Sequence, residues 1–388
     1  MGRKGWLGLV LLVTLVAAGF WLWQQRNQPR VQARVQGPVA AASSNGYARA
    51  TGPRAFDFPA DYGPHPDFQT EWWYYTGNLD TAEGRHFGYQ LTFFRRAVTP
   101  PADRVARASA WTADQVIMAH FALTDVQGKQ FYAFERLERA GAGLAGAQAE
   151  PFAVWLNDWR VQAETPAAAR FTMQAAAEGV AIDFTLTSRK NVVLQGDRGY
   201  SQKGPDPGNA SYYTSLTRLE TEGTLTVSGE TYAVTGWSWQ DHEYSTSALA
   251  ADQIGWDWFA LQLDDNSELK VFHIRRADGS VDPFSAGSFV DAAGNVTPLT
   301  RDDFEISVDR TWRSPRSDAP YPARWLVTVP RLNLRVELTP WLADQELNVS
   351  YSYWEGAVQI AGTRNGVAVR GNGYVEMTGY AGSMQGQF

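Results

Sequence analysis

The sequence has 388 residues, 44% hydrophobic and 19% charged, which is typical of a folded protein long enough for two domains. It contains no cysteine, which excludes disulfides, thiolate catalysis, thiolate metal sites and lipid attachment to cysteine. The net charge is −7, and five of the 34 basic residues lie in residues 1–34, which leaves 29 basic against 41 acidic residues and argues against nucleic acid as a partner.

The N-terminus has the pattern of a targeting segment. Arg3 and Lys4 precede 19 uncharged residues, 5–23, and a basic and polar stretch follows from Arg26. The uncharged run is long for a signal peptide and just long enough to span a bilayer. Residues 1–25 are therefore predicted to be a cleaved signal peptide or an uncleaved anchor helix that contacts the membrane, followed by a linker over 26–55. In both cases we expect an exported body, periplasmic or anchored to the inner membrane and facing the periplasm.

From residue 56 onward, short alternating runs of aromatic and β-branched residues are separated by Gly, Asp and Asn turns. Because strand side chains alternate between two faces, these runs predict strands. The expected strands are Glu71–Thr76, Phe87–Arg95, Ile117–Thr124, Phe131–Leu137, Phe152–Val161, Phe171–Ala177, Ala181–Ser188, Thr224–Val227, Tyr232–Trp239, Trp256–Leu263, Leu269–Arg275, Ala323–Val329, Leu334–Leu338, Val349–Tyr353, Ala357–Ile360 and Gly373–Thr378. Helical turns are expected only at Asp302–Phe304 or Ser245–Ala251. The pattern favours an all-β fold of antiparallel barrels or sandwiches.

Two hairpins in this pattern resemble each other. The first pairs Trp73–Leu79 with residues 88–96, and the second pairs Trp258–Leu263 with residues 269–276. In both, a strand that begins with tryptophan precedes a strand that ends in Arg-Arg. The repetition predicts two β-barrel domains, residues 56–245 and 246–388.

The densest functional signal lies in residues 236–259. On one face of a strand we expect Trp237, Trp239, Asp241 and Glu243, and on one face of the next Trp256 and Trp258. Indoles set among carboxylates are typical of an apolar pocket with a few polar groups. Desolvation would raise the pKa of a carboxyl group there, so that it could act as an acid.

The triplet Asp241-His242-Glu243 is open to other interpretations. A zinc site is disfavoured because His242 points away from its neighbours in a strand. Glycoside hydrolysis would use two carboxylates, but these are roughly 7 Å apart, between the separations of the two glycosidase classes. The carboxylates could also simply lie at the surface beside a turn. Neither a phosphate loop, nor a serine nucleophile motif, nor a metal-spaced histidine set occurs, so no metal or cofactor is expected.

An earlier cluster offers further candidates for ligand binding. Glu71, Trp73 and Tyr75 share a strand face and could form a pocket wall, or Glu71 could pair with Arg95 or Arg96 while the aromatic residues fill a core. His120, in an apolar strand, is either a ligand-binding residue or a hydrogen-bonded core histidine. The C-terminal segments around Glu355 and Glu376 are predicted to be structural.

Together these motifs resemble the carotenoid 1,2-hydratase family, also called the CrtC/AttH lipocalin-like family, over about residues 60–381. The resemblance rests on His65-Pro66-Asp67, Glu71-Trp72-Trp73-Tyr74, Gly77-Asn78-Leu79, Gln90-Leu91-Thr92-Phe93-Phe94-Arg95, Met118-Ala119-His120-Phe121-Ala122, Tyr212-Tyr213-Thr214-Ser215, Asp241-His242-Glu243, Gly255-Trp256-Asp257-Trp258-Phe259, Asp344-Gln345-Glu346-Leu347, Tyr353-Trp354-Glu355-Gly356 and Gly379-Tyr380. It implies two tandem lipocalin-like β-barrels, and the leader is similar to that of exported members of the family.

The resemblance also implies an activity, the addition of water to a carbon–carbon double bond of an isoprenoid without a cofactor. Asp241 or Asp257 would be the acid, and Glu243 is a further catalytic candidate. His242, Tyr244 or His120 would orient water. The four tryptophans would stabilise a cation: Trp237, Trp239, Trp256 and Trp258. Two alternatives remain, a non-catalytic carrier of lipids or isoprenoids in the envelope, and a glycan-active hydrolase.

Overall fold

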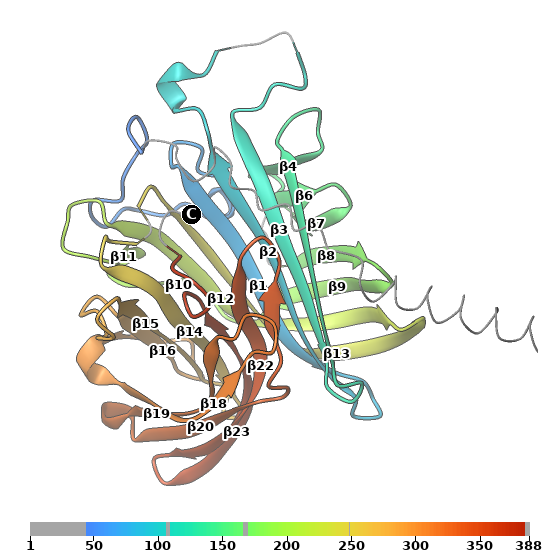
Figure 1. Ribbon diagram of the computed structural model, residues 1–388, viewed down its shortest axis with the longest axis vertical. Coiled ribbons are helices and arrows are strands. Elements are labelled where there is room, and N and C mark those ends of the chain that lie inside the picture. Colours follow the sequence, from blue (N-terminus) through green and yellow to red (C-terminus); the bar gives the residue numbers. More distant parts are fainter. Residues whose placement is uncertain (1–43, 106–108, 166–169, 248, 385–388) are drawn as a thin grey trace, which may run out of the picture. The chain divides into compact units, whose positions relative to one another are not determined.

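The computed structural model describes residues 44–105, 109–165, 170–247 and 249–384 (Figure 1). These residues form β-strands and four short 3-10 turns: η1 (Ala60–Tyr62), η2 (Pro101–Asp103), η3 (Arg301–Asp303) and η4 (Pro330–Leu332). The all-β prediction is confirmed. Among the described residues no helix is long and apolar enough to cross a bilayer. The predicted signal or anchor at 1–25 lies outside them, as does most of the 26–55 linker.

The first sheet holds the 13 strands found between residues 70 and 245 of the described chain. They are β1 (Thr70–Asp80), β2 (His86–Ala97), β3 (Gln115–Asp125), β4 (Gln130–Arg139), β5 (Ala145–Gln148), β6 (Ala153–Leu156), β7 (Trp159–Ala163), β8 (Arg170–Ala177), β9 (Val180–Ser188), β10 (Val193–Leu194), β11 (Tyr200–Gln202), β12 (Ala210–Val227) and β13 (Glu230–Ser245). The main order is β4-β3-β2-β1-β13-β12-β9-β8-β7-β6-β5, with β10 and β11 also paired to β12. The sheet forms a nearly closed barrel.

The second sheet holds the ten strands after residue 252 of the described chain, in the order β17-β16-β15-β14-β23-β22-β20-β19-β18, with β21 also paired to β22. They are β14 (Gln253–Leu263), β15 (Glu268–Arg276), β16 (Ala286–Val290), β17 (Val296–Thr300), β18 (Glu305–Arg313), β19 (Pro320–Val329), β20 (Leu334–Pro340), β21 (Glu346–Asn348), β22 (Ser352–Arg364) and β23 (Val367–Met377). This sheet forms a half-barrel, and the expectation of two lipocalin-like barrels is confirmed.

The repeated hairpin has the same place in both sheets. β1 pairs antiparallel with β2 and with the last strand of its sheet, β13. β14 pairs in the same way with β15 and with β23. The first sheet ends at Ser245 and the second begins at Gln253, and both belong to one compact unit, residues 36–388.

Several predicted elements differ from those observed. The expected strand Phe152–Val161 is two strands, β6 and β7, because the chain turns at Asn157, whose φ of 54° lies in the left-handed region. The expected strand Val349–Tyr353 crosses the turn between β21 and β22. The expected helical turn at Ser245–Ala251 is absent from the described residues there, and the one at Asp302–Phe304 appears one residue earlier as η3.

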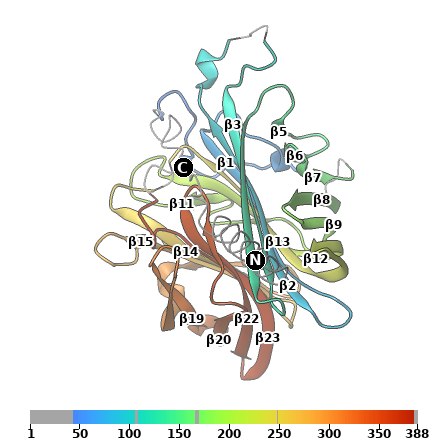
Figure 2. The same ribbon diagram turned by 45° about the vertical axis from the view of Figure 1, so that its right-hand side comes forward.

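The two sheets pack through their outer faces, and β22 and β23 lie beside β2 and β1 (Figures 1 and 2). The approach is close at Gly88, where an added Cβ would lie 2.4 Å from the Cβ of Ala357. Asn78 donates a hydrogen bond across this contact to the Gly373 carbonyl at 3.0 Å. Separate apolar clusters fill the interior of each barrel. Space for a ligand is therefore found between the sheets.

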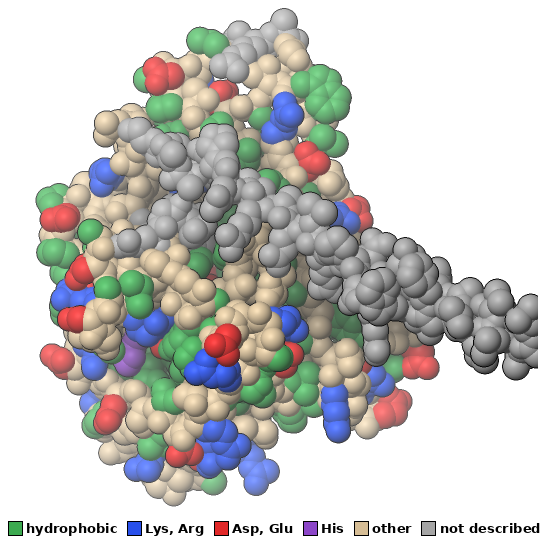
Figure 3. All heavy atoms as spheres, viewed as in Figure 1, with side chains coloured by type: hydrophobic (Ala, Val, Ile, Leu, Met, Phe, Trp, Pro, Cys, Tyr) green, Lys and Arg blue, Asp and Glu red, His purple; other side chains and the backbone are tan. Residues whose placement is uncertain are grey.

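The surface carries charges of both signs. On the face drawn in Figure 3, acidic and basic side chains are interspersed with apolar ones. Pairs such as Arg324 with Glu337, 2.6 Å apart, are partly exposed and contribute about 1 kcal/mol or less each. The fold therefore depends mainly on the buried apolar clusters.

Candidate functional site

A cavity lies between the outer faces of the two sheets, with an empty volume of about 890 Å³ that includes solvent at its mouth. Its aromatic lining consists of Trp72, Tyr74, Phe94, Tyr213, Trp256, Trp258 and Phe272. Its ionisable lining consists of Lys203, Asp241, Glu243 and Glu376. An apolar wall with a few convergent polar groups is the usual composition of a small-molecule site.

Strand alternation decides which aromatic side chains reach this cavity. On β1, Trp73 and Tyr75 are buried in the core of the first barrel, whereas Trp72 and Tyr74 face the cavity. On β14, Trp256 and Trp258 line the cavity. The tryptophan-rich sequences thus supply a barrel core and a cavity wall from the same strands.

Asp241 is the most firmly held carboxylate of the cavity. Its Oδ1 accepts hydrogen bonds from Ser215 Oγ at 2.6 Å and from Trp239 Nε1 at 2.7 Å, and its Oδ2 accepts one from Tyr213. Trp258 Nε1 donates to the Tyr213 hydroxyl at 3.0 Å. Burial raises the pKa of Asp241, while the charge of Lys270 and these hydrogen bonds oppose the rise. The result is a fixed carboxylate that can accept a proton.

Glu376 brings a second carboxyl group to the cavity from β23. It lies opposite Trp258 on one neighbouring strand and Glu355 on the other. Desolvation, opposed by a hydrogen bond with Trp256 and reinforced by the Asp241 charge, raises the pKa of Glu376 to about 8. Burial and the Glu376 charge also raise the pKa of Glu355 well above its usual range. Near neutral pH, Glu376 is therefore mostly protonated and can donate a proton.

Glu243 forms an ion pair at the cavity with Lys203. Lys203 Nζ lies 3.1 Å from Glu243 Oε1, which also accepts a hydrogen bond from Ser211. Lys203 follows β11, so the pair joins a loop to β13. The pair holds Lys203 at the edge of the cavity.

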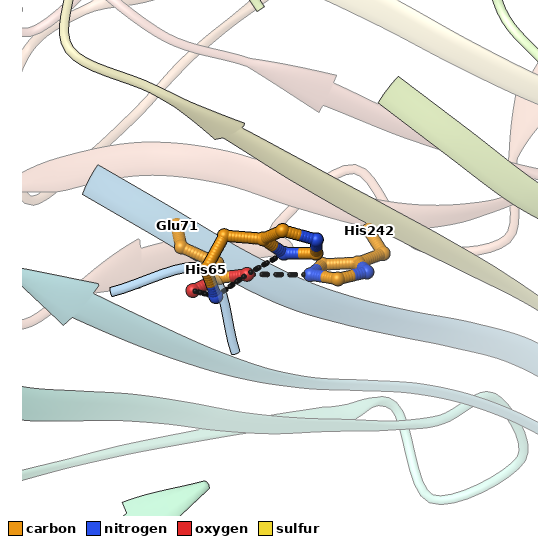
Figure 4. A group of neighbouring side chains, drawn as sticks. All are labelled: His65, Glu71 and His242. Atoms are coloured by element: carbon orange, nitrogen blue, oxygen red, sulfur yellow. Dashed lines mark hydrogen bonds and ion pairs between the residues drawn. The ribbon is translucent and has the colours of Figure 1, made fainter. Parts of the chain in front are cut away.

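A second cluster of ionisable groups lies on the interior face of the first barrel (Figure 4). Glu71 Oε1 lies 2.9 Å from His65 Nδ1 and 2.8 Å from His242 Nε2, and Arg95 Nε donates to Glu71 Oε2 at 2.7 Å. Against the effect of burial, Arg95 and both histidines hold the pKa of Glu71 well below its usual range. The ligand atoms of His65, Glu71 and His242 lie within 4.8 Å of one another and could hold a metal ion. The contacts with Arg95 make the cluster an ion-paired network, as expected in one interpretation of Glu71.

The sequence candidates are thus divided among different places. Asp241, Glu243, Trp256 and Trp258 line the cavity, and Trp239 supports Asp241. Several candidates do not line it, because alternation turns them to the opposite face of their strand: Glu71, Trp73, Tyr75, His242, Tyr244 and Asp257.

The candidates outside the cavity have specific partners. Tyr244 stacks on His65 with ring centroids 3.6 Å apart. Asp257 lies 3.0 Å from Arg275 Nε and accepts a hydrogen bond from Tyr380 at 3.0 Å. These contacts place both residues in structural networks rather than against the cavity.

Two further candidates lie outside the cavity. His120 joins the sheets, with Nδ1 2.6 Å from the Tyr353 hydroxyl and Nε2 3.0 Å from Glu135. Trp237 is 37% exposed and lies beneath Arg218, whose guanidinium carbon is 5.1 Å from the ring centre. Neither residue lines the cavity.

The sequence patterns predict a structural role for Glu376 and indicate no role for Lys203, although both line the cavity. Tyr213 was recognised only as part of a motif. One feature of the sequence does point to Glu376: it shares a strand face with Tyr374 on β23, the last strand of the second sheet in chain order. Because β13 and β23 lie far apart in the chain, the sequence does not show that both strands line one cavity.

Comparison with known proteins places the chain among proteins of the same fold. A profile of the AttH-like family matches residues 49–380. A crystal structure of an AttH protein from Nitrosomonas europaea is 37% identical, covers 86% of this chain and 99% of that chain, and has a TM-score of 0.76. No curated protein matches the sequence.

More distant solved structures share the fold. Kievitone hydratase from Nectria haematococca is 16% identical, with 88% of this chain and 98% of that chain covered and a TM-score of 0.64. CghA, solved with Sch210972, is 12% identical, with 87% and 97% covered and a TM-score of 0.51. The match to the family profile and the 37% identity show that the chain belongs to the AttH-like family.

Proposed function

We propose that the protein is a hydro-lyase that adds water to a carbon–carbon double bond of a hydrophobic ligand in the cavity between the sheets. The observation that carries this proposal is one aromatic cavity lined by two carboxyl groups in different environments, Glu376, whose pKa is raised by burial, and Asp241, which is fixed by hydrogen bonds. Two carboxyl groups whose environments differ can divide the roles of acid and base.

The proposed reaction begins with proton transfer from the Glu376 carboxyl group to one carbon of the double bond. The other carbon becomes a carbocation, and the oxygen of a water molecule attacks it. Asp241 accepts the proton that this water loses, and the proton returns to Glu376 through solvent. All atoms and charges balance over the cycle. General acid–base catalysis of this kind contributes about 10²- to 10⁴-fold in rate.

The aromatic wall would stabilise the cation. Tyr74 and Trp258 meet edge to face, with ring centroids 5.2 Å apart, and both line the cavity. A cation over such a ring gains roughly 0.5–2 kcal/mol. Because Tyr74 also donates to Glu355 at 2.8 Å, its ring is held in place before the ligand binds.

The substrate is proposed to be a carotenoid or another isoprenoid, because the aromatic wall suits an apolar chain. The motifs that resemble those of carotenoid 1,2-hydratases support this class, and the fold shared with kievitone hydratase supports hydration as the reaction. We also propose that the body is exported, on the basis of the uncharged segment 5–23 and its basic flanks. The proposed partner is a hydrophobic small molecule, with membrane contact through the N-terminal segment if it is uncleaved.

Titration of the full-length protein with lycopene, a fatty acid and an oligosaccharide tests the proposal. Tryptophan fluorescence reports binding, and mass spectrometry of each mixture reports chemistry. We expect quenching by lycopene and a product heavier by one water. Glu376→Gln should keep the quenching and lose the product, while the exposed Glu222→Gln variant should keep both.

The other outcomes identify the alternatives. Binding of lycopene or the fatty acid without a mass change would refute the hydratase and indicate a carrier, and quenching by the oligosaccharide alone would indicate a glycan-active protein. Loss of the product in Asp257→Asn but not in Glu376→Gln would overturn the role of Glu376, because Asp257 lies outside this cavity.

A further inference from the structure

Lys270 is a buried amine that the proposed hydration does not use. It lies on β15, on the same strand face as Phe272 and Ile274, which line the cavity. The residue is 2% exposed. Its Nζ lies 4.2 Å from the ring centre of Tyr213 and 4.5 Å from that of Phe272. The amine therefore lies against the cavity wall.

The amine of Lys270 differs from the other buried lysine nitrogens in its partners. Lys190 Nζ lies 2.9 Å from a Glu268 oxygen and donates to two backbone carbonyls. Lys203 pairs with Glu243. Within the described part of the chain, Lys270 Nζ makes neither a hydrogen bond nor an ion pair. Removal of this amine from water favours its neutral form.

The neighbourhood of Lys270 is that of an activated nucleophile. Lys203 Nζ also lies 4.5 Å from the centre of the Phe272 ring, so two amines flank one aromatic side chain. Burial, together with the charge of Lys203, lowers the pKa of Lys270, and this lowering outweighs the opposite effect of the Asp241 and Glu243 charges. Desolvation and a second cation are the conditions under which lysine reacts with carbonyl groups.

We propose that Lys270 forms a Schiff base with hydrophobic aldehydes or ketones bound in the cavity. The Nζ lone pair attacks the carbonyl carbon, and the oxygen takes a proton to give a carbinolamine. Loss of one water leaves an iminium ion, and hydrolysis later restores the amine and the carbonyl. The ring of Tyr213 packs against Nζ, and its hydroxyl donates to Asp241.

This inference rests on the cavity of the proposed hydratase and adds α,β-unsaturated aldehydes and ketones to the substrates that it could hydrate. An iminium ion conjugated with the double bond withdraws electrons from it. Water then adds its oxygen to the β-carbon, and a proton is delivered to the α-carbon. Hydrolysis of the imine releases a β-hydroxy carbonyl compound.

Reductive trapping tests the Schiff base. Full-length protein is incubated with decanal and sodium cyanoborohydride, which supplies the hydride that converts an imine into a stable secondary amine. Peptide mass spectrometry then locates the adduct. We expect labelling of Lys270 at least about tenfold faster than of the exposed Lys129, because each unit by which a pKa falls raises the neutral fraction about tenfold.

Variants make this test decisive. Lys270→Met and Lys270→Arg should lose the adduct, and Lys129→Met should keep it. Lys270→Arg keeps a long basic side chain but has no amine that forms a Schiff base, and circular dichroism checks that both variants fold. Wild-type protein that is labelled at Lys129 but not at Lys270 would overturn the proposal.

The trapping result and the hydratase result can fail separately. Glu376→Gln should keep the adduct even where it abolishes hydration. Incubation of the wild-type protein with β-ionone, a conjugated ketone, should yield a hydrated product that Lys270→Arg does not form. If lycopene, which has no carbonyl group, is hydrated equally by Lys270→Arg and the wild type while decanal is not trapped, the hydratase stands and the Schiff base is refuted.

Discussion

Replacement of Glu376 by glutamine should make the protein more stable, by an amount that grows with pH. The pKa of Glu376 rises from an ordinary 4.5 to about 8 in the folded protein. Between these values the unfolded chain binds fewer protons than the folded protein, so ionisation of Glu376 lowers stability as pH rises. Each pKa unit corresponds to about 1.4 kcal/mol, so the cost reaches at most roughly 5 kcal/mol above about pH 8. Because glutamine does not ionise, the Glu376→Gln variant does not lose this stability.

Urea unfolding followed by tryptophan fluorescence measures this difference at about pH 5, pH 7 and pH 9. We expect the free energy of unfolding of Glu376→Gln to exceed that of the wild type by about 1 kcal/mol at the lowest pH and by several kcal/mol at the highest. The exposed Glu222→Gln variant controls for the general effect of pH. A difference that stays constant over this range would show that Glu376 ionises as in water and would refute its role as a neutral acid.

Three further substitutions test the rest of the site and its support. Tyr213→Phe removes the hydroxyl that donates to Asp241 and accepts from Trp258. Urea unfolding should show that the free energy of unfolding falls by about 1–3 kcal/mol for each buried group left unpaired, and an unchanged midpoint would contradict the network. Glu71→Gln leaves Arg95 without its counter-charge and should cost about 3–5 kcal/mol at neutral pH. Because the pKa of Glu71 is lowered in the folded protein, ionised Glu71 stabilises the fold above about pH 4.5, and this stabilisation is lost as the pH falls further. The difference in unfolding free energy between the wild type and Glu71→Gln should therefore shrink in acid, and a difference independent of pH would contradict the ion pair. Trp258→Ala should cost about 3–5 kcal/mol and weaken binding of apolar ligands, and fluorescence titration showing unchanged affinity would place the ligand elsewhere.

The strand pattern and the repeat were predictable because they depend on local alternation and turn chemistry. Runs such as Phe87–Arg95 and Leu269–Arg275 fall within β2 and β15. The repeated hairpin correctly marked the first two strands of each sheet. Short strands such as β5, β10 and β11 were missed, because two to four residues carry too little alternation to detect.

Alternation also predicted which side chains share a face, but not which face meets the other sheet. Asp241 and Glu243 were placed together, as were Trp256 and Trp258, and each pair does line one cavity. The sequence could not decide that Asp257 would face away from it.

The sequence by itself therefore determined an all-β protein of two barrels and the sets of side chains that alternate along each strand. Only the tertiary structure decided that Glu376 and Asp241 line one cavity and that Lys270 packs against its aromatic wall, since β13, β15 and β23 lie far apart in the chain. The physical reason is that strand periodicity is fixed by local backbone geometry, whereas the contact between two sheets depends on how their outer faces pack.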